Sequence, residues 1–230
     1  MRTIGLIGGM SWESSVLYYQ IINRRTQAIL GDSHSAESLM HSVDFGTIAK
    51  LQHDGNWAEL EKMMIAAAVR LERSGADLVV ICTNTMHMFA DEIGNSVKIP
   101  LLHIGDATGE TIKSTGLKKI GLLGTKFTME KDFLKKRLLD KFEIETLIPD
   151  DADREKVHSI IYNELVKGEI NESSRAIFLD VIEKLTANGA EGIVLGCTEI
   201  PLLVTPEYTD AVLFDTTRLH AEMAVDFALN

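Results

Sequence analysis

The chain has 230 residues, 45% of them hydrophobic and 25% charged, which is the composition of an ordinary globular protein. Its formal net charge of −11 argues against nucleic acid or an anionic membrane as the main partner, because both repel a negative protein. No segment approaches the roughly 20 apolar residues of a membrane-spanning helix, and the first residues lack the pattern of a signal peptide. We therefore expect a cytoplasmic protein with reduced thiols.

Short apolar runs alternate with longer segments of helical period along the whole chain. This alternation predicts an α/β protein with mostly parallel sheets. Strands are expected near residues 3–8, 38–45, 77–82, 99–103, 118–123, 143–148, 191–196 and 211–214. Helices are expected near residues 12–30, 56–74, 85–94, 107–115, 127–140, 152–167, 172–188 and 216–229.

Two segments of the chain recur at nearly the same offset. The run IGLIGG at 4–9 returns as IGLLGT at 120–125, and the phrase around Cys82 returns around Cys197. A shared offset indicates an internal duplication and favours two similar lobes; if these lobes face each other, they present one thiol from each side of a shared cleft. We expect the first lobe to contain residues 1–98 plus 211–230 and the second to contain residues 99–210, so that the C-terminal helix returns to the first lobe.

The only two cysteines of the chain, Cys82 and Cys197, each follow an apolar strand and precede a threonine. Ligands of parallel α/β sheets bind beyond the carboxyl ends of the strands, which is where both thiols are expected. The start of the next helix is expected to lower the thiol pKa, which suits a pair of proton carriers. The alternatives are a disulfide or two small buried hydrophobic residues. A metal site is not expected, because neither thiol has Cys-x-x-Cys or paired-histidine spacing around it.

The residues around the thiols offer hydrogen-bond donors for a small substrate with a carboxylate or an ammonium group. These donors are Thr83, Asn84, Thr85 and Thr198. Two further residues, His87 and Glu199, are close enough in sequence to tune the thiols, although a structural role is equally compatible with their positions. The glycines after the first strand lack the G-x-G-x-x-G spacing of a dinucleotide loop, so a tight strand-to-helix turn is the better interpretation.

Over nearly its whole length the chain resembles the aspartate/glutamate racemase family of cofactor-independent amino-acid racemases. Five segments in their order carry the resemblance: IGGMSWES at 7–14, CTNTMH at 82–87, HIGDAT at 103–108, LGTKFTM at 123–129 and LGCTEI at 195–200. The resemblance implies two pseudo-symmetric α/β lobes, an active site in the interlobe cleft and a homodimer. It also implies inversion of a free amino acid by two cysteines that act as acid and base, without pyridoxal phosphate or any other cofactor.

Site residues are transferred from the family position by position. Cys82 and Cys197 match the catalytic pair. Lys167 resembles the basic residue that faces the distal carboxylate of acidic substrates, whereas Gln52 stands where some aspartate racemases have arginine. The full set of expected substrate contacts is Met10, Gln52, Thr83, Asn84, Thr85, Thr125, Lys167, Thr198 and Glu199.

These observations predict an aspartate and/or glutamate racemase that produces or consumes a D-amino acid. The glutamine at position 52 leaves open a broad-specificity amino-acid racemase of the same family. Related enzymes that use one cysteine, as a nucleophile in maleate cis–trans isomerases or as the sole acid in arylmalonate decarboxylases, are disfavoured by the matched pair of thiols. Two other classes stay open, namely a two-lobe amino-acid-binding protein without catalysis and a redox-active cysteine pair.

Overall fold

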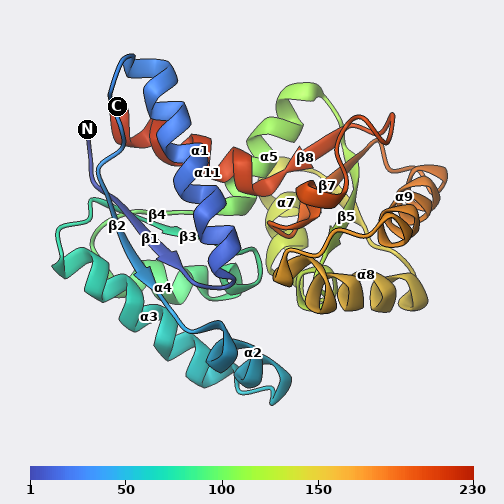
Figure 1. Cartoon of the computed structure of the whole chain (residues 1–230), viewed down its shortest axis with the longest axis horizontal. Helices are drawn as coiled ribbons and strands as arrows, with labels where there is room; N and C mark the ends of the chain where they lie inside the picture. The colour runs from blue at the N-terminus through green and yellow to red at the C-terminus, as the bar shows by residue number, and fades with distance from the viewer. The chain divides into compact units, whose positions relative to one another are not determined.

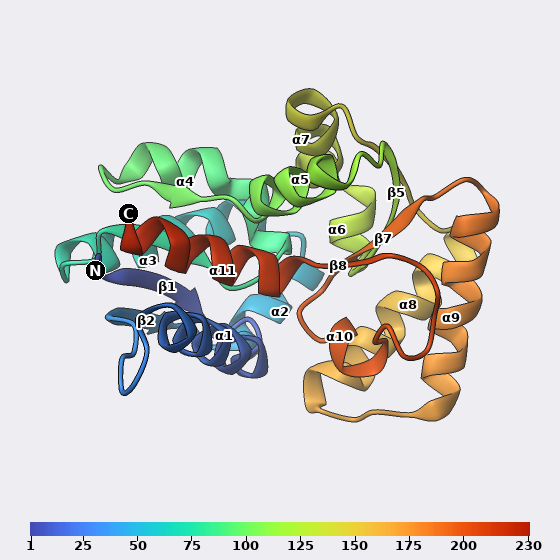
Figure 2. The same ribbon diagram turned by 90° about the horizontal axis from the view of Figure 1, so that it is seen from above.

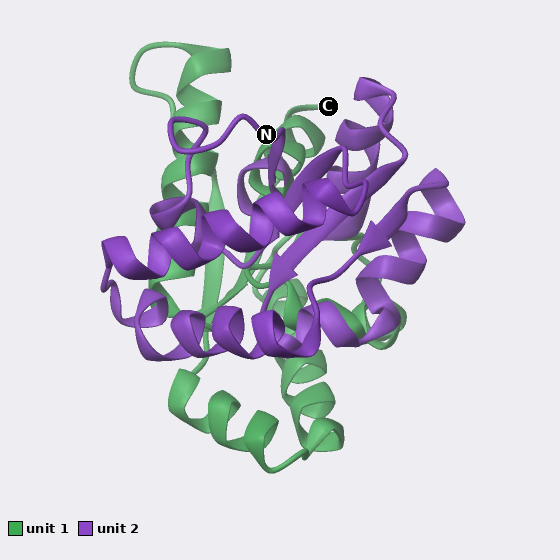
Figure 3. Ribbon diagram, turned by 90° about the vertical axis from the view of Figure 1, so that its right-hand side faces the viewer, with its two compact units in different colours: residues 1–103, 220–230 green, residues 104–219 purple.

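The computed structural model describes residues 1–230 and separates them into two compact units (Figure 3). Unit 1 contains residues 1–103 and 220–230, and unit 2 contains residues 104–219. Each unit has one four-stranded parallel sheet between helices (Figure 1), which confirms the predicted α/β class. Strand β8 (Leu213–Asp215) pairs with β7 and belongs to unit 2, so the chain returns to unit 1 only at residue 220.

The sheet of unit 1 has the strand order β2-β1-β3-β4. Its strands are β1 (Ile4–Gly8), β2 (Ser38–Ser42), β3 (Leu78–Ile81) and β4 (Leu101–Leu102). Its helices are α1 (Trp12–Leu30), α2 (Phe45–His53), α3 (Trp57–Arg73), α4 (Ala90–Ser96), the 3₁₀ helix η1 (Thr85–Phe89) and most of α11 (Thr216–Leu229). This order places β1 and β3 at the centre of the sheet, where both faces are covered.

Alternate residues of β3 contribute to two different hydrophobic clusters, as the twofold period of a strand requires. Leu78 and Val80, together with Cys82 directly after the strand, pack with residues of α1 and α11. Val79 and Ile81 pack on the opposite face with residues of α3 and α4. In Figure 2, β1 is drawn between α1 and α11. The thiol of Cys82 therefore belongs to the α1–α11 face.

Unit 2 repeats this topology with the strand order β6-β5-β7-β8. Its strands are β5 (Lys119–Gly124), β6 (Glu145–Leu147), β7 (Gly192–Gly196) and β8. Its helices are α5 (Ile104–Thr115), α6 (Lys126–Glu130), α7 (Asp132–Phe142), α8 (Asp151–Asn163), η2 (Leu165–Lys167), α9 (Glu172–Ala187) and α10 (Ile200–Leu203). Because β3 and β7 occupy the same place in their sheets, the two cysteines follow equivalent strands.

All eight predicted strands are present, but the helices differ from the prediction in detail. The predicted helices at 85–94, 127–140 and 152–167 are each split into two pieces. The strand predicted at 38–45 ends at Ser42, because Asp44 caps helix α2 by accepting hydrogen bonds from the amide and hydroxyl groups of Thr47. The sequence did not predict α2 or α10, which are too short to show a clear helical period.

The glycines after β1 form the tight turn that the sequence predicted. Gly9 has a φ of +93°, and a Cβ atom at this position would overlap the backbone of Val43. The chain then enters α1 through Ser11, whose side chain accepts a hydrogen bond of 3.4 Å from the amide of Ser14. The turn therefore places the start of α1 directly beyond the carboxyl end of β1.

Candidate functional site

Cys82 is fully buried at the carboxyl end of the central strand β3. Its amide donates a hydrogen bond of 2.9 Å to the carbonyl of Ile7 in β1, so the ladder between the strands continues through the cysteine. Its carbonyl accepts a hydrogen bond of 2.8 Å from the buried hydroxyl of Ser14 in α1. The backbone on both sides of the thiol is thus fixed by neighbouring elements.

The residues after Cys82 form one compact turn. The amide of Thr83 donates to the carbonyl of Ile81 at 2.9 Å, and the amide of His87 donates to the carbonyl of Asn84 at 3.0 Å. Nδ1 of His87 lies 2.8 Å from the carbonyl of Thr83. Asn84 and Thr85 are buried where η1 begins. The structure therefore brings the predicted residues 82–85 together in one turn.

His87 belongs to a buried cluster of aromatic side chains in unit 1. Its ring centroid lies 4.7 Å from that of His103 and 5.3 Å from that of His220. Nδ1 of His220 lies 2.8 Å from the hydroxyl of Tyr18, and its Nε2 lies 2.9 Å from the carbonyl of Leu102. A carbonyl can only accept, so Nε2 of His220 carries hydrogen, and in the neutral ring Nδ1 accepts from the tyrosine.

Cys197 occupies the equivalent position after β7, but its surroundings differ. Its thiol donates a hydrogen bond of 2.9 Å to Oε2 of Glu199, and the hydroxyl of Thr198 donates to the same oxygen at 2.8 Å. All three residues are buried. One carboxylate oxygen of Glu199 therefore binds both the thiol of Cys197 and the hydroxyl of Thr198.

Burial raises the pKa of the Cys82 thiol well above its ordinary value. Burial also raises the pKa of Cys197, and the negative charge of Glu199 together with the hydrogen bond to it raises that pKa further. The expectation that a helix start lowers the pKa of each thiol is therefore wrong for the protein without a bound substrate. The sequence pattern revealed a helix start near each thiol, but the loss of hydration on burial raises the thiol pKa by more than the helix start lowers it.

Tyr162, near Cys197, and its neighbour His158 were not predicted as part of the site. The pKa of Tyr162 is raised by its burial and by the charges of Cys197 and Glu199, which places its hydroxyl group near them. The ring of Tyr162 lies 4.6 Å from that of His158, whose Nδ1 accepts a hydrogen bond of 3.2 Å from the amide of Lys126. Their spacing of one helical turn on α8 is the only sequence signal for this pair.

The remaining predicted residues are distributed over several elements. Thr125 follows the end of β5, next to the strand that leads to Cys197, and its hydroxyl accepts a hydrogen bond of 3.3 Å from the amide of Thr128. Met10 packs in the hydrophobic cluster below β1, and Gln52 is buried on α2. Lys167 is exposed at the end of η2.

The chain contains no group of three or more His, Cys, Asp or Glu side chains arranged to hold a metal ion. Both cysteines are free thiols. None of the helices combines the length and the apolar character that are needed to cross a bilayer.

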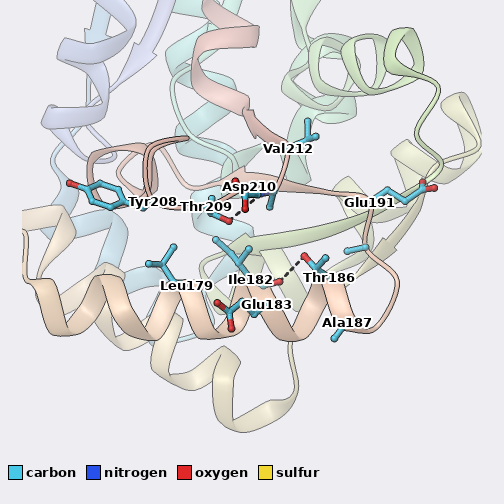
Figure 4. Close-up of a pocket in the computed structure, with 12 residues that line it drawn as sticks. Leu179, Ile182, Glu183, Thr186, Ala187, Glu191, Tyr208, Thr209, Asp210 and Val212 are labelled. Carbon is cyan, nitrogen blue, oxygen red and sulfur yellow. Dashed lines mark hydrogen bonds between the residues drawn. The ribbon is translucent and has the colours of Figure 1, made fainter.

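Unit 2 also has an open groove of about 740 Å³ (Figure 4). Its walls are the second half of α9 and the segment at 208–212, with residues 190 and 191 at one end. The last two segments precede β7 and β8, so the groove lies at the amino ends of these strands. It contains none of the predicted site residues. Ligands of parallel sheets bind at the opposite edge, where Cys197 lies.

Comparison with known proteins identifies the class of this two-sheet α/β protein. The family model described as Asp/Glu/Hydantoin racemase matches residues 7–224. Its class is therefore that of the racemases, which are isomerases. The chain belongs to the Asp/Glu/hydantoin racemase family.

Three similar proteins cover essentially the whole chain. The broad-specificity amino-acid racemase RacX of Bacillus subtilis is 24% identical over 227 residues, which are 96% of each chain. A structure from Yersinia pestis, described as a candidate Asp/Glu racemase, is 50% identical with a TM-score of 0.93 over 100% of both chains. The structure of an aspartate racemase homologue from Pyrococcus horikoshii is 33% identical with a TM-score of 0.87, again over 100% of both chains.

The contact between Cys197 and Glu199 predicts how the reactivity of this thiol responds to mutation. In a Cys82→Ser background, Glu199→Gln removes the charge that raises the pKa of Cys197. A lower pKa increases the thiolate fraction at any pH near neutrality, so alkylation of Cys197 by iodoacetamide should become faster. The rate is measured against pH, and its midpoint should shift to lower pH.

The matched control is Glu207→Gln, which removes an exposed carboxylate from the same unit. It should leave the alkylation profile unchanged. Equal profiles for the Glu199 and Glu207 variants would contradict the electrostatic role that we assign to Glu199.

Proposed function

We propose that the chain is a cofactor-independent amino-acid racemase that inverts the α-carbon of aspartate and/or glutamate, with Cys82 and Cys197 as its acid and base. The observation that carries the proposal is the equivalence of the two thiols: each is buried and follows the third strand in sequence of a sheet with the same strand order. The aspartate racemase homologue at 33% identity supports an acidic substrate.

The proposed reaction moves one proton off the substrate and another onto it. A thiolate removes the α-proton and becomes a thiol, which leaves a planar carbanion with the electron pair of the broken C–H bond. The other thiol then protonates the opposite face and becomes a thiolate. The reverse reaction exchanges the roles of the two sulfurs, so the same pair converts either enantiomer into the other. One of these enantiomers is the D-amino acid. The two thiols titrate as a coupled pair.

Burial raises the pKa of both thiols, so the bound substrate must help to form the thiolate. An amino acid brings an α-ammonium group, and a positive charge within a few ångström of a sulfur lowers the pKa of its thiol. Glu199 offers a second route in unit 2, because its carboxylate already binds the hydrogen of Cys197. In this proposal the base forms only when the substrate is present, which protects the thiols from other reactions.

Acidification of the α-hydrogen requires donors around the substrate carboxylate. We assign this role to residues where helices begin: Asn84 and Thr85 at η1 and Thr125 at α6. Backbone amides at a helix start point toward a bound anion, and preorganised donors stabilise the charge that develops on it. Further proposed substrate contacts are Met10, Gln52, Thr83, Thr198 and Glu199.

Replacement of either thiol tests the catalytic assignment. Cys82→Ser and Cys197→Ser should each lower the rate of racemisation by about 100- to 10,000-fold, the range of a lost acid or base. Chiral chromatography of the chiral amino acids found in proteins, without added cofactor, gives the rates. Incorporation of deuterium from D₂O at the α-carbon reports proton removal independently.

A single serine variant that keeps wild-type turnover in both directions would contradict the two-base assignment. Tight binding of an amino acid by the wild-type protein, without inversion or deuterium uptake, would instead indicate a binding protein. Reversible oxidation of both thiols at cellular potentials, without racemisation, would indicate a redox role.

Substrate selection rests on Lys167 in this proposal. Lys167→Met should raise KM for aspartate and glutamate by about 10- to 100-fold, the effect of losing a hydrogen bond to a charged group. Activity on neutral amino acids should not change. Lys113→Met, which alters an exposed lysine on α5, is the control. Wild-type KM for acidic substrates in the Lys167 variant would favour the broad-specificity alternative, which Gln52 and the similarity to RacX support.

We further propose that the protein is a cytoplasmic homodimer that uses the outer face of α1. Trp12, Val16 and Tyr19 repeat at helical spacing and are 63%, 40% and 52% exposed. Large apolar side chains gathered on one face are typical of protein interfaces.

Static light scattering measures the molar mass in solution and tests this interface. Val16→Glu combined with Tyr19→Glu should produce monomers, because carboxylates at the centre of an apolar contact are costly to bury. Leu139→Glu alters an exposed leucine on α7 and should leave the dimer intact. A wild-type monomer, or a double variant that stays dimeric, would overturn the proposal.

A further inference from the structure

The two peptide groups that follow β3 are each held by a buried side chain from another position. The carbonyl of Cys82 accepts from the hydroxyl of Ser14 at 2.8 Å, and the carbonyl of Thr83 accepts from Nδ1 of His87 at 2.8 Å. The Ser14 side chain is fully buried, and His87 is 2% exposed. Since a carbonyl only accepts, Nδ1 of His87 carries the hydrogen.

These two bonds determine the course of the backbone immediately after the thiol. A peptide group is planar and trans, so its N–H points opposite to its C=O. The bond to Ser14 therefore sets the direction of the Thr83 amide, which meets the carbonyl of Ile81 at 2.9 Å. The bond to His87 sets the direction of the Asn84 amide away from the imidazole. Together they orient two consecutive amides beside Cys82.

The imidazole of His87 is itself held in place. It packs against the rings of His103 and His220, with centroid distances of 4.7 and 5.3 Å. His220 cannot rotate freely, because both of its nitrogens are hydrogen-bonded, to Tyr18 and to the carbonyl of Leu102. The orientation of Nδ1 is therefore supported by β4, α1 and α11 and does not depend on local sequence alone.

We infer that Ser14 and His87 are positioning residues that together hold the Cys82 thiol and the Asn84 amide in the geometry needed for α-proton transfer. This inference rests on the function proposed above. It concerns two residues that are not among the proposed substrate contacts. The sulfur must meet the α-hydrogen in a near-attack arrangement, and a misplacement of 1 Å costs about 100-fold in rate. Neither side chain needs to touch the substrate for this role.

Two substitutions at position 87 distinguish the effect of the hydrogen bond to Thr83 from the effect of side-chain size. In His87→Asn the amide nitrogen takes the place of Nδ1 and can still donate to the carbonyl of Thr83. In His87→Gln the amide nitrogen lies near the place of Nε2, and the bond to Thr83 is lost. We expect kcat within about threefold of wild type for asparagine and a loss of about 100-fold for glutamine.

Ser14→Ala has a matched control on the same helix. Thr26 is also fully buried on α1, and its hydroxyl donates to the carbonyl of Ile22 at 2.9 Å, within the helix. Thr26→Val therefore deletes a buried hydroxyl donor that does not reach the cysteine turn. We expect Ser14→Ala to lower kcat by about 100-fold, whereas Thr26→Val keeps the wild-type kcat. Thermal unfolding of all four variants reports any loss of stability.

A second measurement does not require racemase activity. In a Cys197→Ser background, iodoacetamide reacts with Cys82 only, and this thiol is fully buried. Loss of either carbonyl bond loosens the turn, so alkylation should be faster in Ser14→Ala and His87→Gln than in His87→Asn and Thr26→Val.

Equal kcat per folded molecule and equal alkylation rates in all four variants would overturn the positioning role. A wild-type protein without racemase activity, but with the expected order of alkylation rates, would instead refute only the proposed function. The two failures are therefore distinguishable.

Discussion

Burial of a titratable sulfur is the constraint on which the rest of this structure depends. Cys82 lies on the face of β3 that is covered by α1 and α11, and its amide is bonded to the neighbouring strand. Without water the thiolate is costly, and the pKa of the thiol rises accordingly. The reactivity of the sulfur is therefore determined by the charges and donors placed around it. Our proposed function assigns one of these charges to the substrate itself.

The two units repeat one topology, but the hydrogen bonds around their cysteines differ. In unit 1 the backbone around Cys82 is held through two carbonyls, by Ser14 and His87. In unit 2 the thiol of Cys197 bonds directly to the carboxylate of Glu199. A racemase that acts on two mirror-image substrates has no need for identical acids. Because of this difference, the orientation of Cys82 depends on bonds to its backbone, whereas the protonation of Cys197 depends on a neighbouring carboxylate.

The buried histidine cluster shows how distant segments cooperate at one turn. Tyr18 and His220 are 202 positions apart in sequence, yet their polar atoms lie 2.8 Å apart. His220 in turn contacts the end of β4 and packs on the ring of His87. The C-terminal helix thereby contributes to the surroundings of Cys82, although its sequence carries no motif of its own. Helix packing and hydrogen bonding thus both support the turn that follows Cys82.

The sequence by itself determined the α/β class, the internal repeat, all eight strands and the placement of both cysteines at strand ends, because these features depend on local periodicity. The tertiary structure decided the contacts of Ser14, Tyr162 and His220, because each depends on which distant elements pack together. It also reversed the expected direction of the cysteine pKa. A helix start is visible in a few neighbouring residues, whereas loss of hydration depends on every segment that covers the sulfur.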